Sequence, residues 1–242
     1  MGAVSERLSA NTLVGHDRIS AMKLTFSTSL LFCSALFAAL PVVPGGAMFE
    51  NDQVKVVRAL EKAHVKGKAH EHKVNRVMVY LQAGQQRFEY QDGRAPEVFN
   101  WKANQVKWSP SNGTHAPEVT GDDSFNIIEV ELKTPGANKA VTGPMDPVKL
   151  DKKVYSVEFE NDQVRVVRVK VGAHKSTPMH EQATNRVTIF LTDQKFRITD
   201  DAGTVTSGDH KAGEAAWGTP QKHKGENLSD QPFEALVVEL KS

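Results

Sequence analysis

The sequence contains one segment twice, and this repeat constrains the fold more than any other feature. Residues 49–81 (FENDQVKVVRALEKAHVKGKAHEHKVNRVMVYL) align without gaps with residues 159–191, and 17 of the 33 aligned positions are identical. The copies also match further on, where Trp108 aligns with Trp217 and His115 with His223. The chain is therefore predicted to fold as two similar small domains, over residues 48–133 and 154–242.

Each copy has the pattern of short β-strands separated by turns. Turn residues such as Asp92-Gly93 interrupt the apolar or alternating runs Val54–Val57, Val77–Leu81, Arg87–Tyr90 and Ile127–Leu132. A convincing helical stripe longer than about two turns is lacking. The fold class is predicted to be all-β, with each copy an antiparallel barrel or sandwich. Residues 134–153, rich in proline and glycine, are predicted to be a linker.

The first 47 residues have the layout of a secretory signal peptide. An apolar run of eleven residues, Leu30–Leu40, follows Lys23, and Gly45-Gly46-Ala47 supplies small residues for cleavage. We expect a mature chain from Met48 onward and a periplasmic or secreted location, with residues 1–21 an upstream extension. The sole cysteine, Cys33, lies in the removed segment, so the mature chain would hold no thiol. The alternative is an N-terminal amphipathic or buried helix.

Charge excludes two classes of partner. The chain has 30 Lys and Arg against 29 Asp and Glu. A nearly neutral chain is a poor binder of nucleic acid or of anionic membranes. We therefore expect no nucleic acid as a partner, and no membrane once the signal is removed.

Histidines occupy matching places in the two copies, and the first copy has the richer set. His70 and His72 are two residues apart, so on a strand both imidazoles project from the same face and can reach one ion. A third histidine, His115, follows a turn-rich segment late in the copy, where an adjacent strand can bring it close. The pairs at matching positions are His64 with His174, His70 with His180, and His115 with His223.

These motifs resemble those of the cupin superfamily. The first motif of that family holds a His-x-His pair, here Ala69-His70-Glu71-His72 followed by Asn75-Arg76-Val77, and the second holds one more histidine, here His115 within residues 108–118. The second copy matches with Met179-His180-Glu181-Gln182 and with His223. The resemblance implies a bicupin: two tandem double-stranded β-helix (jelly-roll-like) barrels, each with its site inside the barrel.

The sequence departs from the family pattern at the ligands. A carboxylate usually follows the second histidine by four or five residues, where this chain has Arg76 and Val77. The resemblance then leaves His70, His72 and His115 as the ligands of one metal. Neutral imidazoles suit zinc, iron, copper or nickel rather than magnesium or calcium.

The second copy lacks one of these histidines. Gln182 replaces the second histidine, which leaves His180 and His223. An amide oxygen is a weak substitute for imidazole, so we expect this site to be weak or empty and the metal to occupy the first barrel alone.

His64 and His174 stand where the first family motif normally has glycine. Three interpretations are open: a fourth ligand, a partner of a ligand, or a position inherited at duplication. The tryptophans at positions 101, 108 and 217 are expected to be core or barrel-rim residues.

Arg76 and Arg186 share the parity of the histidine pair, so an uninterrupted strand would turn both toward the barrel interior. One hypothesis is a substrate-binding role, in which the guanidinium clamps a carboxylate. The other is a structural salt bridge, with Glu118 for Arg76 and Glu226 for Arg186.

Together these features predict an exported bicupin with one divalent transition metal in the first barrel. It would bind or act on a small organic molecule, with dioxygenase-like or isomerase-like chemistry at most, and the sequence leaves open whether it is an enzyme. The alternative is a non-catalytic binding or structural bicupin with decayed sites. A monomer with an internal pseudo-dimer and a homodimer are both compatible with the sequence.

Overall fold

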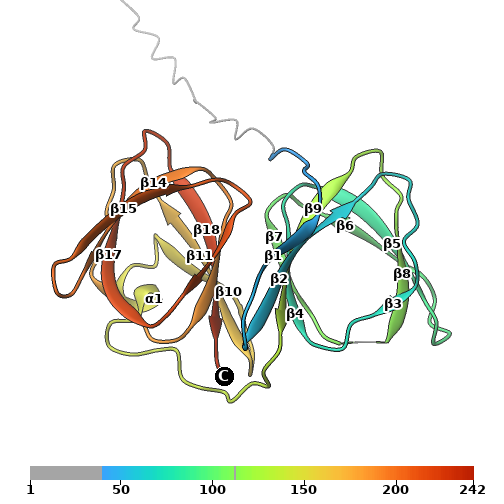
Figure 1. Cartoon of the computed structure of the whole chain (residues 1–242), viewed down its shortest axis with the longest axis horizontal. Coiled ribbons are helices and arrows are strands. Elements are labelled where there is room, and N and C mark those ends of the chain that lie inside the picture. Colours follow the sequence, from blue (N-terminus) through green and yellow to red (C-terminus); the bar gives the residue numbers. More distant parts are fainter. Residues whose placement is uncertain (1–39, 112) are drawn as a thin grey trace, which may run out of the picture. The chain divides into compact units, whose positions relative to one another are not determined.

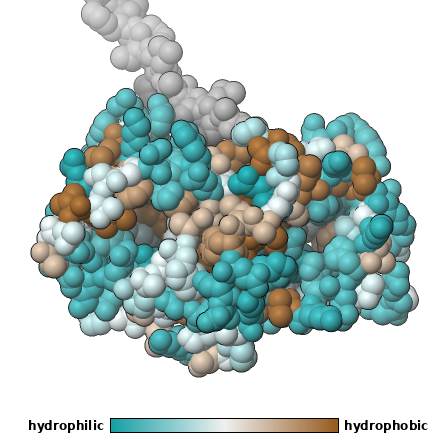
Figure 2. Space-filling view, viewed as in Figure 1, coloured by the Kyte–Doolittle hydropathy of each residue, from teal (hydrophilic) through white to brown (hydrophobic). Residues whose placement is uncertain are grey.

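The computed structural model describes residues 40–111 and 113–242 (Figure 1). Most of the apolar run predicted as a signal peptide, together with Cys33, lies outside the described residues. Within the part described, no helix has the length and apolarity to cross a membrane. Figure 2 shows a face dominated by hydrophilic side chains, with apolar ones scattered among them.

The first nine strands form two antiparallel sheets that close a barrel. One sheet has the strand order β1-β2-β9-β4-β7 and the other β3-β8-β5-β6 (Figure 1). The strands are β1 (Gly46–Glu50), β2 (Val54–Glu61), β3 (His70–Glu71), β4 (Arg76–Tyr80), β5 (Gly84–Tyr90), β6 (Glu97–Trp101), β7 (Gln105–Ser109), β8 (Thr114–Val119) and β9 (Phe125–Leu132).

The next nine strands repeat this arrangement as a second barrel. Their sheets have the orders β10-β11-β18-β13-β16 and β12-β17-β14-β15, which match the first barrel strand for strand. The strands are β10 (Tyr155–Glu160), β11 (Val164–Val171), β12 (His180–Gln182), β13 (Arg186–Phe190), β14 (Gln194–Asp200), β15 (Val205–His210), β16 (Ala215–Gly218), β17 (Gln221–Asn227) and β18 (Phe233–Leu240).

The all-β prediction is confirmed. The predicted strand runs fall in β2, β4, β5 and β9. The predicted turns are also present, and their glycines, Gly93 and Gly203, have φ of 85° and 84°, a conformation that glycine adopts without steric cost. The single helix of the described residues is α1 (Pro147–Leu150), which begins after the N-cap Asp146 within the predicted linker.

Strands β4 and β9 bury side chains on both faces. In β4, Val77 and Val79 pack into a cluster with valines and leucines of both barrels. The alternate residues, Met78 and Tyr80, pack into a separate cluster with Phe125 and Trp101 of the first barrel. Because successive side chains point to opposite faces, odd-numbered positions of β4 contribute to the shared core and even-numbered ones to the barrel interior. Arg76 belongs to the second set.

Matching residues of the two barrels exchange hydrogen bonds. Asn75 donates its side-chain amide to Gln163, and Asn185, at the position that matches Asn75, donates to Gln53 at 2.6 Å. Gln53 and Gln163 also match in the alignment. The contact is therefore made twice, once from each barrel.

Residues 40–47 are bonded to the first barrel. The buried side chain of Asn126 accepts a hydrogen bond from the backbone N–H of Val43 and donates one to its carbonyl, both at 2.8 Å. Gln82 donates to the carbonyl of Leu40 at 2.9 Å. Residues 46 and 47 also pair with β2, so cleavage after Ala47 would divide strand β1.

We predict that a chain beginning at Met48 is less stable than one beginning at Leu40. The shorter chain loses the partners of two buried amides, Asn126 and Gln82, and part of β1. At about 1 kcal/mol for each lost hydrogen bond, the free energy of unfolding should fall by about 2–4 kcal/mol. Urea unfolding of both chains measures this difference. Equal unfolding midpoints with equal slopes would show that residues 40–47 contribute nothing.

Candidate metal centre and binding pockets

Three histidines converge in the first barrel. Strand β3 pairs with β8 so that His70 lies directly opposite His115. The ring of His72 lies 4.7 Å from that of His70 and 5.3 Å from that of His115, centroid to centroid. One ring nitrogen from each residue falls within 4.8 Å of the others. The structure thus brings together the three side chains that the sequence singled out.

Hydrogen bonding and burial prepare the imidazoles of the cluster for a metal. Nδ1 of His70 lies 2.9 Å from the carbonyl of Lys68, which fixes a tautomer with Nδ1 protonated and Nε2 free to bind a metal. Burial, reinforced by the neighbouring cations and imidazoles, lowers the pKa of His72 to about 3 and that of His115 to about 4. Both rings therefore remain neutral at pH 7, which is the form that binds metals.

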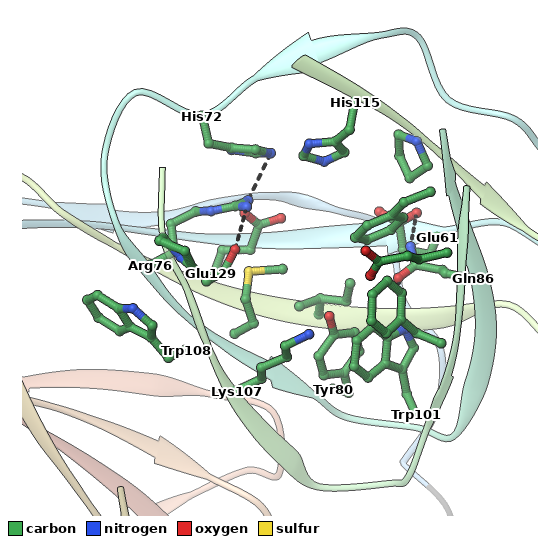
Figure 3. A pocket seen from close by; sticks show the side chains of 18 of the residues that line it. Glu61, His72, Arg76, Tyr80, Gln86, Trp101, Lys107, Trp108, His115 and Glu129 are labelled. Carbon is green, nitrogen blue, oxygen red and sulfur yellow. Dashed lines mark hydrogen bonds and ion pairs between the residues drawn. The ribbon is translucent and has the colours of Figure 1, made fainter. Parts of the chain in front are cut away.

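Arg76 lies beside the histidines and is itself buried. Its Nη1 lies 2.9 Å from Nε2 of His72 and 2.6 Å from a carboxylate oxygen of Glu129, while Nη2 lies 2.9 Å from Oγ of Ser109 (Figure 3). Arg76 thus faces the barrel interior and forms a salt bridge there.

The predicted salt-bridge partners of the two arginines were wrong. Glu118 lies on β8, in the other sheet, directly opposite Arg87, with which it pairs at 3.5 Å. Glu226 pairs with Arg197 in the same way, at 3.0 Å. Glu129 is the partner of Arg76 because β9 lies next to β4 in the first sheet.

The donor set fits a transition-metal ion. Three neutral nitrogens close together are the ligands that zinc, iron, copper and nickel accept. A second group, His72 with Glu129 and Glu131, also has one ligand atom from each residue within 4.8 Å. Arg76 donates into both groups. Binding through Nε2 of His72 therefore requires that Arg76 release this atom.

A cavity of about 270 Å³ extends from the histidines into the barrel. Figure 3 shows Glu61 and Gln86 on the opposite side of this cavity from Arg76. Trp101 donates from Nε1 to Gln86 at 2.9 Å, and Gln86 donates to Glu61 at 3.0 Å. Burial, together with Glu129, raises the pKa of Glu61. The cavity thus contains a carboxyl group that is held in place and that keeps its proton more readily than an exposed one.

Sequence reasoning missed the polar residues inside this cavity: Glu61, Tyr80, Gln86, Lys107 and Glu129. A signal existed for Glu129 and Glu131, because they alternate with buried apolar residues in IIEVEL and so point to the side away from the apolar core. Lys107 shows no comparable signal, since only the fold places its Nζ 4.4 Å from the ring centroid of Phe99.

The second barrel brings its two histidines together without a third. His180 lies directly opposite His223, and their ring centroids are 4.4 Å apart. Nδ1 of His180 lies 2.9 Å from the carbonyl of Pro178, as at His70, but its Nε2 lies 3.4 Å from the hydroxyl of Tyr155. Gln182 lies beside them at the end of β12. The atom that would face a metal therefore already has a partner.

His64 and His174 lie outside both clusters. Their φ angles are 57° and 54°, in the left-handed region, which explains why the family motif favours glycine there. Their rings contact the carboxylates of Asp122 and Asp230, at 3.1 and 2.8 Å. The interpretations of His64 and His174 as a fourth ligand or as a ligand's partner were therefore wrong.

The tryptophans lie in the core, as expected. Trp101 is buried and stacks on Tyr80 with 4.0 Å between ring centroids. Trp108 and Trp217 pack against the cluster shared by the two barrels. Trp101 and Trp108 also line the cavity of the first barrel.

A scan against protein-family models and a search of curated proteins found no match. Among solved structures, the chain is similar to AerE from Microcystis aeruginosa, with a TM-score of 0.57, 13% identity and coverage of 81% of this chain and 96% of that one. A cupin 2 conserved barrel domain protein from Leptotrichia buccalis matches with a TM-score of 0.51 and 12% identity, over 82% of this chain and 88% of that one. An oxalate decarboxylase from Bacillus subtilis with Mn(II) centres matches with a TM-score of 0.53 and 12% identity, over 78% of this chain and 69% of that one. At such identities the likeness shows the fold alone: the chain has the all-β, jelly-roll-like fold of cupin proteins.

Proposed function

We propose that the first barrel binds one divalent transition metal through His70, His72 and His115, and that its cavity accepts a small organic molecule. The observation that carries this proposal is the convergence of three imidazole nitrogens, all within 4.8 Å of one another, at a cavity of about 270 Å³. Zinc, iron, copper and nickel all suit this donor set. The solved neighbour with Mn(II) centres supports metal binding by a barrel of this fold.

A bound metal would polarise a substrate oxygen or activate water or dioxygen. The chain's own residues supply the remaining functions. Glu61, fixed by Gln86, can hold or release a proton at its carboxyl group. Lys107 places a cation beside the rings of Phe99 and Trp101, where it can attract an anionic substrate group. These groups suit a small polar molecule and chemistry of an isomerase or dioxygenase type.

The metal belongs to the first barrel alone in this proposal. The second barrel offers two imidazoles, and Tyr155 contacts Nε2 of one of them. We also propose that the protein is exported to the periplasm or secreted, on the basis of the apolar run Leu30–Leu40 and the small residues Gly45-Gly46-Ala47. A small molecule is its proposed partner, with the chain either a monomer or a homodimer.

A non-catalytic binding protein is the second candidate. The observation that favours it is the hydrogen bond between Arg76 and His72, because a guanidinium at a ligand nitrogen competes with a metal ion for the same lone pair. In that case the cavity would bind its ligand with Arg76 and Lys107 and without a metal.

We predict that the purified chain binds one equivalent of a divalent transition metal. Calorimetric titration with Zn²⁺ and elemental analysis after dialysis measure this. His70→Ala with His72→Ala should reduce the affinity at least about 100-fold, because one imidazole cannot hold the ion. His64→Asn is the matched control, since asparagine tolerates the left-handed backbone and His64 lies outside the cluster. If the chain binds none of zinc, iron, copper and nickel, the metal proposal is wrong and the non-catalytic binding protein remains.

Replacing Arg76 should strengthen metal binding. In Arg76→Gln a positive charge leaves the cluster, Nε2 of His72 is released and Glu129 becomes available as a ligand. Two unit charges about 4 Å apart interact by about 4 kcal/mol at an effective dielectric constant of about 20, so the Zn²⁺ dissociation constant should fall by about tenfold or more. Circular dichroism checks that the variant folds. An unchanged or weaker affinity would show that Arg76 does not compete with the metal.

A further inference from the structure

Arg186 is a buried cation in the second barrel that lacks a carboxylate partner. It is 8% exposed and lines a cavity in that barrel. Its Nη1 donates a hydrogen bond to the carbonyl of Thr219, at 2.6 Å. Among the described residues, no carboxylate forms a salt bridge with it. Since an unpaired buried charge is costly, this position calls for an acceptor.

The first barrel shows what such an arginine normally has. Arg76 occupies the matching position and contacts three side chains: His72, Ser109 and Glu129. These supply an imidazole nitrogen, a hydroxyl and a carboxylate. Arg76 is therefore satisfied from within the protein.

All three partners are replaced in the second barrel. Gly218 lies opposite Arg186 where Ser109 lies opposite Arg76. Glu239 lies opposite Arg186, just as Glu131 lies opposite Arg76. Val237, two residues before Glu239, therefore takes the place of Glu129. Gln182 takes the place of His72. The guanidinium has been kept while every side chain that satisfied it has changed.

The nearest carboxylates serve a different arginine. Glu239 lies opposite Arg186 in the sheet, but Arg165 donates to both of its oxygens, from Nε and Nη2. Arg165 also donates to both oxygens of Asp146, at 3.0 and 3.1 Å. Burial lowers the pKa of Arg186, and the charge of Glu239 opposes this without a direct contact. Arg186 thus receives only distant compensation.

Other polar groups beside Arg186 also lack partners. Oε1 of Gln182, Oε1 of Gln194 and Nδ1 of His223 are buried atoms without a hydrogen bond in the described structure. All three residues line the same cavity as Arg186 and are more than nine-tenths buried. Side-chain amides can turn either their N–H₂ or their oxygen toward a ligand. Together with the arginine they form a set of polar groups that lines one space, in which the two amides can each present a donor or an acceptor.

The rest of the cavity has more apolar side chains than that of the first barrel, and its one carboxylate, Glu226, pairs with Arg197. Phe196 occupies the place of Gln86, and Phe190 that of Tyr80, as the strand registers show. Ile198, Phe233 and Val237 complete the wall. The cavity measures about 160 Å³, close to the roughly 150 Å³ of an apolar cavity that admits benzene. It suits a body of about the size of one aromatic ring.

We infer that the second barrel is a metal-independent binding site for small monocarboxylates with an apolar body, held by a two-pronged contact between the carboxylate and Arg186. The carboxylate takes the place that Glu129 fills in the first barrel, and the ring or alkyl group lies among the phenylalanines. This site does not depend on the metal proposed for the first barrel.

Calorimetric titration of the full chain with benzoate tests this inference. We expect one molecule to bind, with the same affinity before and after treatment with a chelator. Benzamide has the same shape without the charge and should bind at least about 30-fold more weakly, as expected when a buried charge pair loses one partner. Arg186→Met should weaken benzoate binding by a similar factor. Arg87→Met is the matched control, because Arg87 lies in the first barrel, lines neither cavity and pairs with Glu118.

Val237→Glu provides a second variant that is expected to fold. It rebuilds the carboxylate of the first barrel beside Arg186, so the chain should satisfy its own arginine and lose benzoate binding, with no decrease in melting temperature. The inference is overturned if benzamide binds as well as benzoate, if Val237→Glu binds benzoate normally, or if chelation abolishes binding. Displacement of benzoate by chloride at equal concentration would also overturn it, since a simple anion site would then suffice. None of these results depends on whether the histidines of the first barrel bind a metal.

Discussion

A buried guanidinium at the start of β4 and of β13 is the constraint on which the interior of both barrels depends. Arg76 and Arg186 are 4% and 8% exposed, and each must find acceptors among the side chains that its sheet brings near. In the first barrel Glu129 provides the acceptor, and the resulting pair holds Arg76 against His72. In the second barrel Val237 stands in place of that carboxylate. The two cavities therefore differ first in what their arginine contacts.

The two barrels share their strand order but have separate chemistry. Strands such as β4 and β13 contribute alternate residues to the shared core, where Val77 and Val187 are fully buried. The other face is free to vary, because it lines a cavity rather than a packed interface. There the first barrel has Tyr80 stacked on Trp101, and the second has Phe190 stacked on His210 at a similar distance, 4.0 and 3.9 Å. One geometry thus supports two cavities that differ in polarity.

The sequence was sufficient for the fold class and for the pairing of His70 with His72, because both depend on local periodicity. That His115 joins them was expected from the family resemblance, since it depends on β3 lying next to β8. Residues two apart share a face of a strand, and the repeat doubled the evidence for each strand. The partner of Arg76 could not be predicted, because it depends on β9 lying next to β4, a pairing between strands far apart in the sequence. The left-handed backbone of His64 was not predicted, although this histidine stands where the family motif normally has glycine.

Metal binding and the salt bridge of the first barrel are linked through His72. Its Nε2 can accept a hydrogen bond from Arg76 or bind a metal ion, but one lone pair cannot serve both. Glu129 has the same choice, since it belongs to the second group of candidate ligands and also holds Arg76. A metal that took His72 would therefore release Arg76 toward the cavity, where it could meet an anionic group, as Arg186 is proposed to do in the second barrel. The arginine that competes with the metal for His72 would then contribute to binding the substrate.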